Sequence, residues 1–231
     1  MKSSGRSRNT QTSPISSLRA MNIAAPDSVH PVSTIALVPL HASVPIEAFG
    51  RRLELALLRF GTTRHLDSAS VAAQPGRDAY DDLALDRLLD EAEKQRRFVI
   101  CQADAEATRW TRTAVAHADR VLFVAQADGP RDVMPIEKAL AERAPASALA
   151  DRELVLLHES RRSAPSGTAA WLAPRSVQRH AHVAWQGSGD FNRLARRISG
   201  HAVSLVLGGG GARGLAQIGA VRAIREAGVP I

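Results

Sequence analysis

The chain contains little cysteine and lysine, and it has no long apolar run. Cys101 is the only cysteine, so no disulfide can form within one chain, which suits a reducing compartment. No apolar stretch reaches the roughly 20 residues of a membrane-spanning helix, and serine and threonine follow the basic start where a secretory signal would be apolar. We therefore expect no transmembrane segment or signal peptide, a location in the cytoplasm or at the inner face of a membrane, and a packed Cys101.

Lysine is so scarce that arginine carries almost all of the positive charge. The lysines are Lys2, Lys94 and Lys138, while the formal net charge is +7. The arginines are scattered through helical patterns and form no single basic block, whereas nucleic-acid binding needs a continuous basic patch or stripe. We expect no nucleic-acid partner, and an anionic membrane surface remains compatible with this charge.

The sequence divides into four segments. Residues 1–33 are rich in serine, with no acidic residue before Asp27, and we expect a disordered tail. From Thr34 to residue 160, apolar runs alternate with helical patterns, which predicts an α/β module. Residues 161–200 are less regular and are interpreted as a connecting segment, with a short strand over 180–184 and a helix capped by Asp190. Residues 201–231 predict the start of a second unit.

Five apolar runs in the α/β module predict strands, namely residues 35–40, 62–66, 98–101, 121–125 and 154–157. Helical spacing separates them, for example from about Asp78, where Leu85, Leu88, Leu89 and Ala92 share one face. Strands that are apolar throughout and alternate with helices indicate a parallel sheet covered on both faces. We expect a Rossmann-like or P-loop-like fold.

A glycine-rich stretch at 208–214 lies between a predicted strand at 202–207 and a predicted helix. Glycines let the backbone turn sharply and present N–H groups at close range, and a helix N-terminus favours negative charge. Three interpretations remain open. Gly209, Gly211 and Gly214 match the G-x-G-x-x-G pattern of a dinucleotide site, although the chain contains no following strand with the confirming acid. The loop could instead form an oxyanion hole, or it could be a turn without chemistry.

The loop and its helix carry a family resemblance. Gly209-Gly210-Gly211-Ala212-Arg213-Gly214, followed by residues 215–224, resembles the opening of the patatin-like phospholipase domain. The upstream sequence is similar to the region that precedes the hydrolase in neuropathy target esterase and its bacterial relatives, on residues 154–158, Thr168 with Trp171-Leu172, residues 180–183, and Asp190 before residues 193–196. Gln102-Ala103-Asp104, Trp110 and Ala118-Asp119 fit the same region.

The resemblance implies the start of an α/β hydrolase domain and a function in lipid acyl-ester hydrolysis. Gly209, Gly210, Gly211, Arg213 and Gly214 would form the oxyanion hole, and the substrate would be a phospholipid or lysophospholipid at a membrane surface. The family's serine, in a G-x-S-x-G elbow, and its dyad aspartate lie further along the chain. Ser188 in Gly187-Ser188-Gly189 lacks the elbow spacing and precedes the loop. We therefore expect no catalytic nucleophile here and no activity of this chain alone.

The α/β module suggests a second class of function, nucleotide binding. Asp104 and Asp128 follow predicted strands, as does the magnesium-binding aspartate of P-loop ATPases. The sequence after the first strand, residues 39–45, lacks G-x-x-x-x-G-K-[ST], so nothing there cradles phosphates. We expect a structural or regulatory module without nucleotide, and we keep a nucleotide- or dinucleotide-binding module as the alternative.

Two other groups of residues are weak candidates for sites. His180 and His182 share one face of a predicted strand, but zinc sites need further ligands, so we expect no metal and no cofactor. Trp110, Trp171 and Trp185 are expected to pack, each with one hydrogen-bonded edge.

Overall fold

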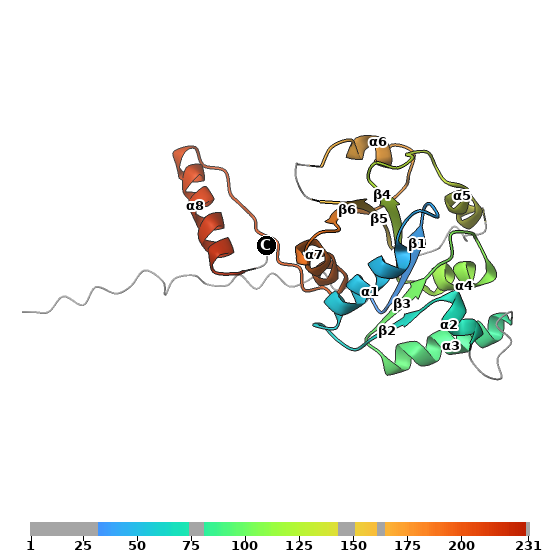
Figure 1. Cartoon of the computed structure of the whole chain (residues 1–231). Coiled ribbons are helices and arrows are strands. Elements are labelled where there is room, and N and C mark those ends of the chain that lie inside the picture. Colours follow the sequence, from blue (N-terminus) through green and yellow to red (C-terminus); the bar gives the residue numbers. More distant parts are fainter. Residues whose placement is uncertain (1–31, 74–80, 143–150, 161–164, 230–231) are drawn as a thin grey trace, which may run out of the picture. The chain divides into compact units, whose positions relative to one another are not determined.

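A computed structural model describes residues 32–73, 81–142, 151–160 and 165–229 of the chain (Figure 1). The elements follow in the order β1 (Thr34–Pro39), α1 (Ile46–Leu57), β2 (Thr63–Leu66), α2 (Ser68–Ala72), α3 (Asp82–Gln95), β3 (Phe98–Gln102), α4 (Arg109–His117), β4 (Arg120–Gln126), α5 (Pro135–Ala141), β5 (Asp151–His158), α6 (Thr168–Leu172), β6 (Arg179–Ala184), α7 (Gly189–Ile198) and α8 (Ala212–Glu226). The tail predicted over 1–33 lies almost wholly outside the described residues.

The core of the fold is a six-stranded sheet in the order β2-β3-β1-β4-β5-β6. Every pairing is parallel, so the carboxyl ends of all six strands meet at one edge. Ile35 in β1 pairs with Ile100 of β3 and Arg120 of β4, which sets the register at the centre. The predicted α/β fold class with a parallel sheet is confirmed.

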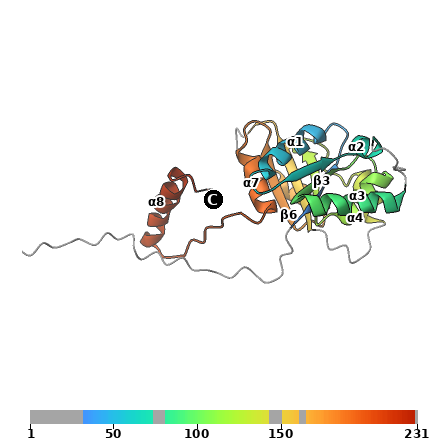
Figure 2. The same cartoon turned by 90° about the horizontal axis from the view of Figure 1, so that it is seen from below.

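Two layers of helices bury the two faces of the sheet. Leu37 and its face pack against Phe49 of α1 and Phe191 of α7, whereas Val38 and the opposite face pack against Ile136 of α5 and Trp171 of α6. A further cluster beneath α3 and α4 continues the second face toward β2. Figure 2 shows α1 and α7 on one side of the strands and α3 and α4 on the other. Burial of both faces is why the strands are apolar throughout.

The α3 helix shows how the local sequence sets an element. The carboxylate of Asp81 caps it by accepting a hydrogen bond from the Leu83 N–H at 3.2 Å. Its buried side chains are those that helical spacing predicts, namely Leu85, Leu88, Leu89 and Ala92. The predicted start at Asp78 lies outside the described residues.

Residues 165–200 belong to the sheet and do not merely connect two units. β6 pairs along its length with β5, and α7 packs on α1 through Phe191 and Leu194. Arg197 of α7 forms an ion pair with the fully buried Glu153 of β5. The predicted short strand over 180–184 is confirmed as β6, but the irregular pattern before it did not reveal that this strand joins the sheet.

The predicted strand over residues 202–207 is wrong. These residues lie outside any helix or strand, and Val206 is 87% exposed. Backbone N–H and C=O groups of a strand need a partner strand, and no described strand pairs with this segment. The apolar run could form a strand, but no described strand of this sheet is its partner.

The handedness of the crossovers explains why the segment does not extend the sheet. The β4-to-β5 and β5-to-β6 steps run toward the β6 edge through α5 and α6, both on one face. The α7 helix lies on the opposite face, beside α1. The α1 helix connects β1 to β2, and that connection runs toward the β2 edge of the sheet. A further step outward through α7 would be left-handed, and nearly all parallel crossovers are right-handed. A strand after α7 therefore cannot be added beyond β6 by the usual right-handed crossover.

Candidate functional site

The glycine loop predicted to hold an oxyanion forms the entry to α8. Gly211 is the N-cap, with φ 51° and ψ −127°, a backbone conformation that favours glycine. The carbonyl of Gly211 accepts a hydrogen bond from the Gly214 N–H at 2.9 Å, and the Gly208 carbonyl accepts one from the Gln217 side chain at 2.5 Å. Among the described residues, none accepts a hydrogen bond from the N–H groups of residues 208–211. These donors are therefore available to a ligand.

The proposed oxyanion residues lie in one continuous run. Gly209, Gly210, Gly211 and Gly214 surround the start of α8, while the Arg213 side chain lies outside the described residues. A Cβ built on Gly209, Gly211 or Gly214 meets nothing within 4 Å, so these glycines are not required by packing against the described residues. Their role as an oxyanion hole stays a prediction.

The crevice where doubly wound folds bind nucleotides is almost filled. The β1 connection runs toward β2 and the β4 connection toward β5, so the crevice lies between the carboxyl ends of β1 and β4. Among the described residues, Leu40, Ser43, Gly129 and Trp171 enclose a cavity of about 10 Å³ there. That volume holds about one water molecule and is far too small for a nucleotide. The Ser43 hydroxyl also donates to the Gln126 side chain at 3.2 Å and joins the two loops.

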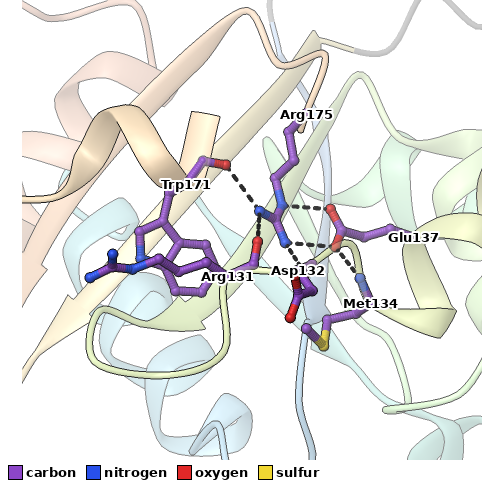
Figure 3. Close-up of polar contacts among 6 residues, drawn as sticks. All are labelled: Arg131, Asp132, Met134, Glu137, Trp171 and Arg175. Carbon is purple, nitrogen blue, oxygen red and sulfur yellow. Dashed lines mark hydrogen bonds and ion pairs between the residues drawn. The ribbon is translucent and has the colours of Figure 1, made fainter. Parts of the chain in front are cut away.

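Arg175 contacts both Trp171 and the β4–α5 loop beside the crevice, and we call these contacts the arginine clamp (Figure 3). The side chain of Arg175 is 2% exposed and forms paired hydrogen bonds with Glu137, at 2.8 and 3.0 Å. It also donates to the carbonyls of Arg131, Asp132 and Trp171, and its guanidinium lies 5.0 Å from the centre of a Trp171 ring. The clamp thus joins α6, α5 and the β4–α5 loop, and its charge-assisted bonds to Glu137 stabilise the closed crevice.

A larger cavity lies beside the crevice, at the carboxyl ends of β4, β5 and β6. Its volume is about 290 Å³, and its lining includes Asp128, Arg131, His158 and His182. His158 Nε2 lies 2.8 Å from His182 Nδ1, and His182 Nε2 lies 3.0 Å from the Thr168 hydroxyl. Two of the lining side chains, His158 and His182, are therefore joined directly, and His182 is tied behind the lining to Thr168.

The two aspartates predicted near strand ends have different environments. Asp104 accepts hydrogen bonds from the hydroxyls of Ser68 and Thr108, both at 2.6 Å, and so anchors the starts of α2 and α4. Asp128 is exposed and lines the cavity. The structure does not bring them together, so they form no magnesium pair.

The remaining predictions concern packing and single side chains. Cys101 is fully buried, and burial raises the pKa of its thiol, so the prediction that it packs is confirmed. Trp110 and Trp171 are buried and donate to the carbonyls of Gln102 and Ala127, as expected, whereas Trp185 is partly exposed and packs edge-on against Phe191.

The described residues contain neither a metal-ligand cluster nor a membrane-spanning helix. Within residues 32–73, 81–142, 151–160 and 165–229, no three or more His, Cys, Asp or Glu side chains gather as metal ligands would. His182 instead bonds to His158 and Thr168, and His180 packs edge-on against it. No helix in the described part of the chain has the length and apolar character to cross a membrane.

Sequence reasoning missed the histidine cavity and the arginine clamp. His158 ends β5 and His182 lies in β6, and polar residues at the carboxyl ends of adjacent parallel strands are a recognisable signal for a site. That signal was hidden because β6 was not assigned to the sheet. No local pattern identifies Arg175, whose partner Glu137 lies 38 residues away.

Comparison of the structure with solved structures supports the fold alone. The MinC:MinD cell division protein complex of Aquifex aeolicus aligns with a TM-score of 0.57 and 12% identity, over 77% of this chain and 100% of that chain. The similarity confirms the P-loop-like arrangement of strands and helices, and at this identity it carries no information on ligand binding.

Comparison of the sequence identifies relatives with higher identity. Patatin-like phospholipase domain-containing protein 7 of Rattus norvegicus is 34% identical, over 87% of this chain and 17% of that protein. Lysophospholipase NTE1 of Yarrowia lipolytica is 33% identical, over 86% and 18%. The chain thus spans less than a fifth of the length of these curated relatives.

A protein-family model matches the α/β module. The model described as the Neuropathy Target Esterase family P-loop like domain matches residues 31–188, which include all six strands of the sheet. The resemblance drawn from the sequence to the region preceding the hydrolase is confirmed at this level. The chain belongs to the Neuropathy Target Esterase family, as its P-loop like domain.

Proposed function

We propose that this chain is the non-catalytic part of a lipid acyl hydrolase that precedes the catalytic centre and contributes the oxyanion loop to it. The loop is residues 208–214, and the substrate class is a lysophospholipid or phospholipid at a membrane surface. The observation that carries the proposal is the run of Gly208 to Gly211, whose N–H groups are available at the start of α8. Such donors, aimed at a developing oxyanion, are the main electrostatic device of ester hydrolysis.

Two further observations support a boundary between the module and the loop. The α7 helix lies on the α1 face, so a right-handed crossover cannot lead from it to a further strand beyond β6. The alignment with the rat relative covers 87% of the chain and must extend past residue 188, because residues 1–188 are a smaller share. We propose that residues from about 201 onward belong to a second unit, which in those relatives' names is a patatin-like phospholipase domain.

The sequence supplies no nucleophile for such a reaction. It contains no G-x-S-x-G, and Ser188 is the residue before the first turn of α7, where it acts as the N-cap. Under the proposal, the serine and the dyad aspartate come from a patatin-type catalytic segment that is not within residues 1–231.

Labelling with an active-site-directed fluorophosphonate tests the proposal. The 231-residue chain alone should take up no label, while a fusion to the catalytic segment of a patatin-like relative should be labelled and should hydrolyse a lysophospholipid. In the fusion, Gly211→Val should lower kcat by about 100- to 1000-fold, because a β-branched residue does not adopt the positive φ that aims the loop. Gly219→Val within α8 is the control and should retain most activity.

Two outcomes would contradict the proposal. Label on a serine of the 231-residue chain would show that a nucleophile is present. Equal activity of the Gly211→Val and Gly219→Val fusions would show that the loop does not hold the oxyanion.

Nucleotide binding is the second candidate, and the structure offers it little support. The crevice of about 10 Å³ between β1 and β4 leaves no room for a base or a phosphate. Only the G-x-G-x-x-G match at Gly209, Gly211 and Gly214 favours it. Saturable binding of ATP or NAD to the chain, lost in Gly211→Val, would favour this candidate over the hydrolase one.

A further inference from the structure

The end of α1 has two exposed leucines one helical turn apart. Leu55 is 68% exposed, and Leu58, the C-cap in helical conformation, is 51% exposed. Among the described residues before Ala202, Leu83 of α3 is the other large aliphatic side chain with such exposure. A single exposed leucine is ordinary on a protein surface. Side chains three residues apart on a helix are neighbours, so Leu55 and Leu58 form a continuous apolar ridge.

Arginine predominates among the charged residues of α1 and α7, which lie beside each other on one face of the sheet (Figure 2). The arginines of the two helices and of the turn after α1 are Arg51, Arg52, Arg59, Arg193, Arg196 and Arg197, and the acidic residues are Glu47, Glu54 and Asp190. Glu47 is exposed, but Arg51 pairs with it at 2.7 Å. We call the leucine ridge together with these arginines the α1–α7 surface, and its net charge is positive.

Two ion pairs of α7 turn their positive member toward solvent. The Asp190 side chain is 9% exposed, whereas that of Arg193, which pairs with it, is 46% exposed. Glu153 beneath α7 is fully buried, and its partner Arg197 is only half-buried. In both pairs the carboxylate therefore lies deeper than the guanidinium, so an anionic partner that approaches α7 meets arginine first.

We propose that the α1–α7 surface docks the chain on an anionic membrane, with Leu55 and Leu58 inserted at the level of the lipid headgroups and the arginines bound to lipid phosphates. Arginine lays its apolar stem along such an interface while its guanidinium reaches the phosphates. Each arginine near an anionic membrane strengthens binding about fivefold. A nucleic acid would use the arginines alone, whereas a membrane uses both the arginines and the leucine ridge.

The chain also leaves the α/β module next to this surface. His201 packs on Phe60, just after α1, with ring centres 4.8 Å apart. Residues 202–207 follow, so Gly208 begins the glycine loop at most about 25 Å of extended chain from His201. Docking through the α1–α7 surface thus keeps the loop within reach of membrane lipid, a consequence that rests on the proposed function in acyl hydrolysis.

Fluorescent probes on the whole chain test which side meets the lipid. The single native cysteine, Cys101, is fully buried, so a thiol-reactive, polarity-sensitive fluorophore will label a cysteine introduced at the surface. The Leu58→Cys probe should shift to the blue with vesicles of phosphatidylcholine and phosphatidylserine, much less with phosphatidylcholine alone, and less as salt rises. Leu83→Cys is the matched control and should not shift, because Leu83 is 55% exposed but follows Asp81 and Asp82.

Vesicle sedimentation of unlabelled variants measures the contribution of each group. Leu55→Ser with Leu58→Ser should weaken binding to the anionic vesicles about tenfold or more, because the inserted apolar area is lost. Arg59→Gln with Arg196→Gln should weaken it about 25-fold.

The α8 helix also exposes apolar side chains, so it needs its own control. Leu215→Ser with Ile218→Ser removes two of them and should leave the binding to anionic vesicles largely unchanged. Leu83→Ser on α3 should bind as the native chain does. All of these positions are at least partly exposed, so the variants should fold, and urea unfolding checks this.

The docking proposal fails if the Leu58→Cys and Leu83→Cys probes respond alike, or if the α8 variant loses binding while the α1 variant keeps it. A blue shift that grows with protein concentration in the absence of vesicles would assign the ridge to a second copy of the chain. Binding of a DNA duplex in place of vesicles would assign the arginines to nucleic acid, and either result overturns the proposal. None of these measurements needs hydrolysis, so failure of the oxyanion proposal would leave their outcome unchanged.

Discussion

At the scale of single residues, His65 shows how burial outweighs attraction. Its ring packs under α1, and burial lowers its pKa although the Glu54 carboxylate lies 3.9 Å away. In the folded chain His65 therefore stays neutral at a pH where the same histidine in the unfolded chain takes up a proton. As pH falls through and below the ordinary imidazole range, the unfolded state binds more protons, so the free energy of unfolding must fall.

Urea unfolding of the native chain and of His65→Gln, from pH about 7.5 to about 5, measures this contribution. The native chain should lose more stability toward acid than His65→Gln, and the difference between them should be flat at the upper end of the range. An identical pH profile for the native chain and His65→Gln would mean that the ring is protonated equally in both states.

At the scale of elements, the close approach of α1 to β2 depends on Gly50. A Cβ at this position would lie 2.6 Å from His65 Cε1 and 3.2 Å from Leu37 Cδ1. Such contacts cannot be accommodated without moving the helix or the ring. We expect Gly50→Ala to lower the free energy of unfolding by about 1–3 kcal/mol, in spite of the better helix propensity of alanine.

Gly219→Ala is the matched control, because Gly219 is also helical and a Cβ there meets nothing within 4 Å. It should be neutral or stabilising by up to about 1 kcal/mol. Chemical denaturation of both variants, compared at the transition midpoint, distinguishes the two effects. Equal changes in Gly50→Ala and Gly219→Ala would show that α1 and β2 can separate at little cost.

The same elements show what the sequence can and cannot predict. Strands β1, β3, β4 and β5 and the buried face of α3 followed from apolar periodicity, because a strand buried on both faces or a helix buried on one leaves a local pattern. The membership of β6 in the sheet did not follow, since Arg179 and His180 at its start are exposed and polar at an open edge. An edge strand is partly exposed, so its sequence lacks the continuous apolar run that marks a central strand of a parallel sheet.

The candidate sites also differ in how well the sequence predicts them. The glycine loop is contiguous, so the sequence alone locates it. Residues 202–207, which precede it, were predicted as a strand because an apolar run does not show whether a partner strand exists. The filled crevice depends on Trp171, Arg175 and Glu137, which come from distant elements. Contacts at such separation depend on topology and leave no local pattern to read.

At the scale of the whole molecule, we expect the α/β module to end near residue 200, because α7 lies on the face from which no right-handed crossover leads beyond β6. A chain ending after His201 keeps α7 and the contact of His201 with Phe60, whose ring centres lie 4.8 Å apart. It loses only residues that the sheet cannot accept through a right-handed connection. Its free energy of unfolding should lie within about 0.5 kcal/mol of that of the full chain, as for changes at surface positions.

A chain ending after Gly187 provides the contrast, because it removes α7 with four buried side chains, Phe191, Leu194, Ala195 and Ile198. Loss of a buried phenylalanine alone costs about 3–5 kcal/mol, so cooperative unfolding should be lost or shifted far toward low denaturant. Calorimetry of both truncations with the full chain makes the comparison. If the chain ending after His201 unfolds as early as the one ending after Gly187, residues 202–229 stabilise the sheet after all, and the boundary proposed here between module and oxyanion loop is misplaced.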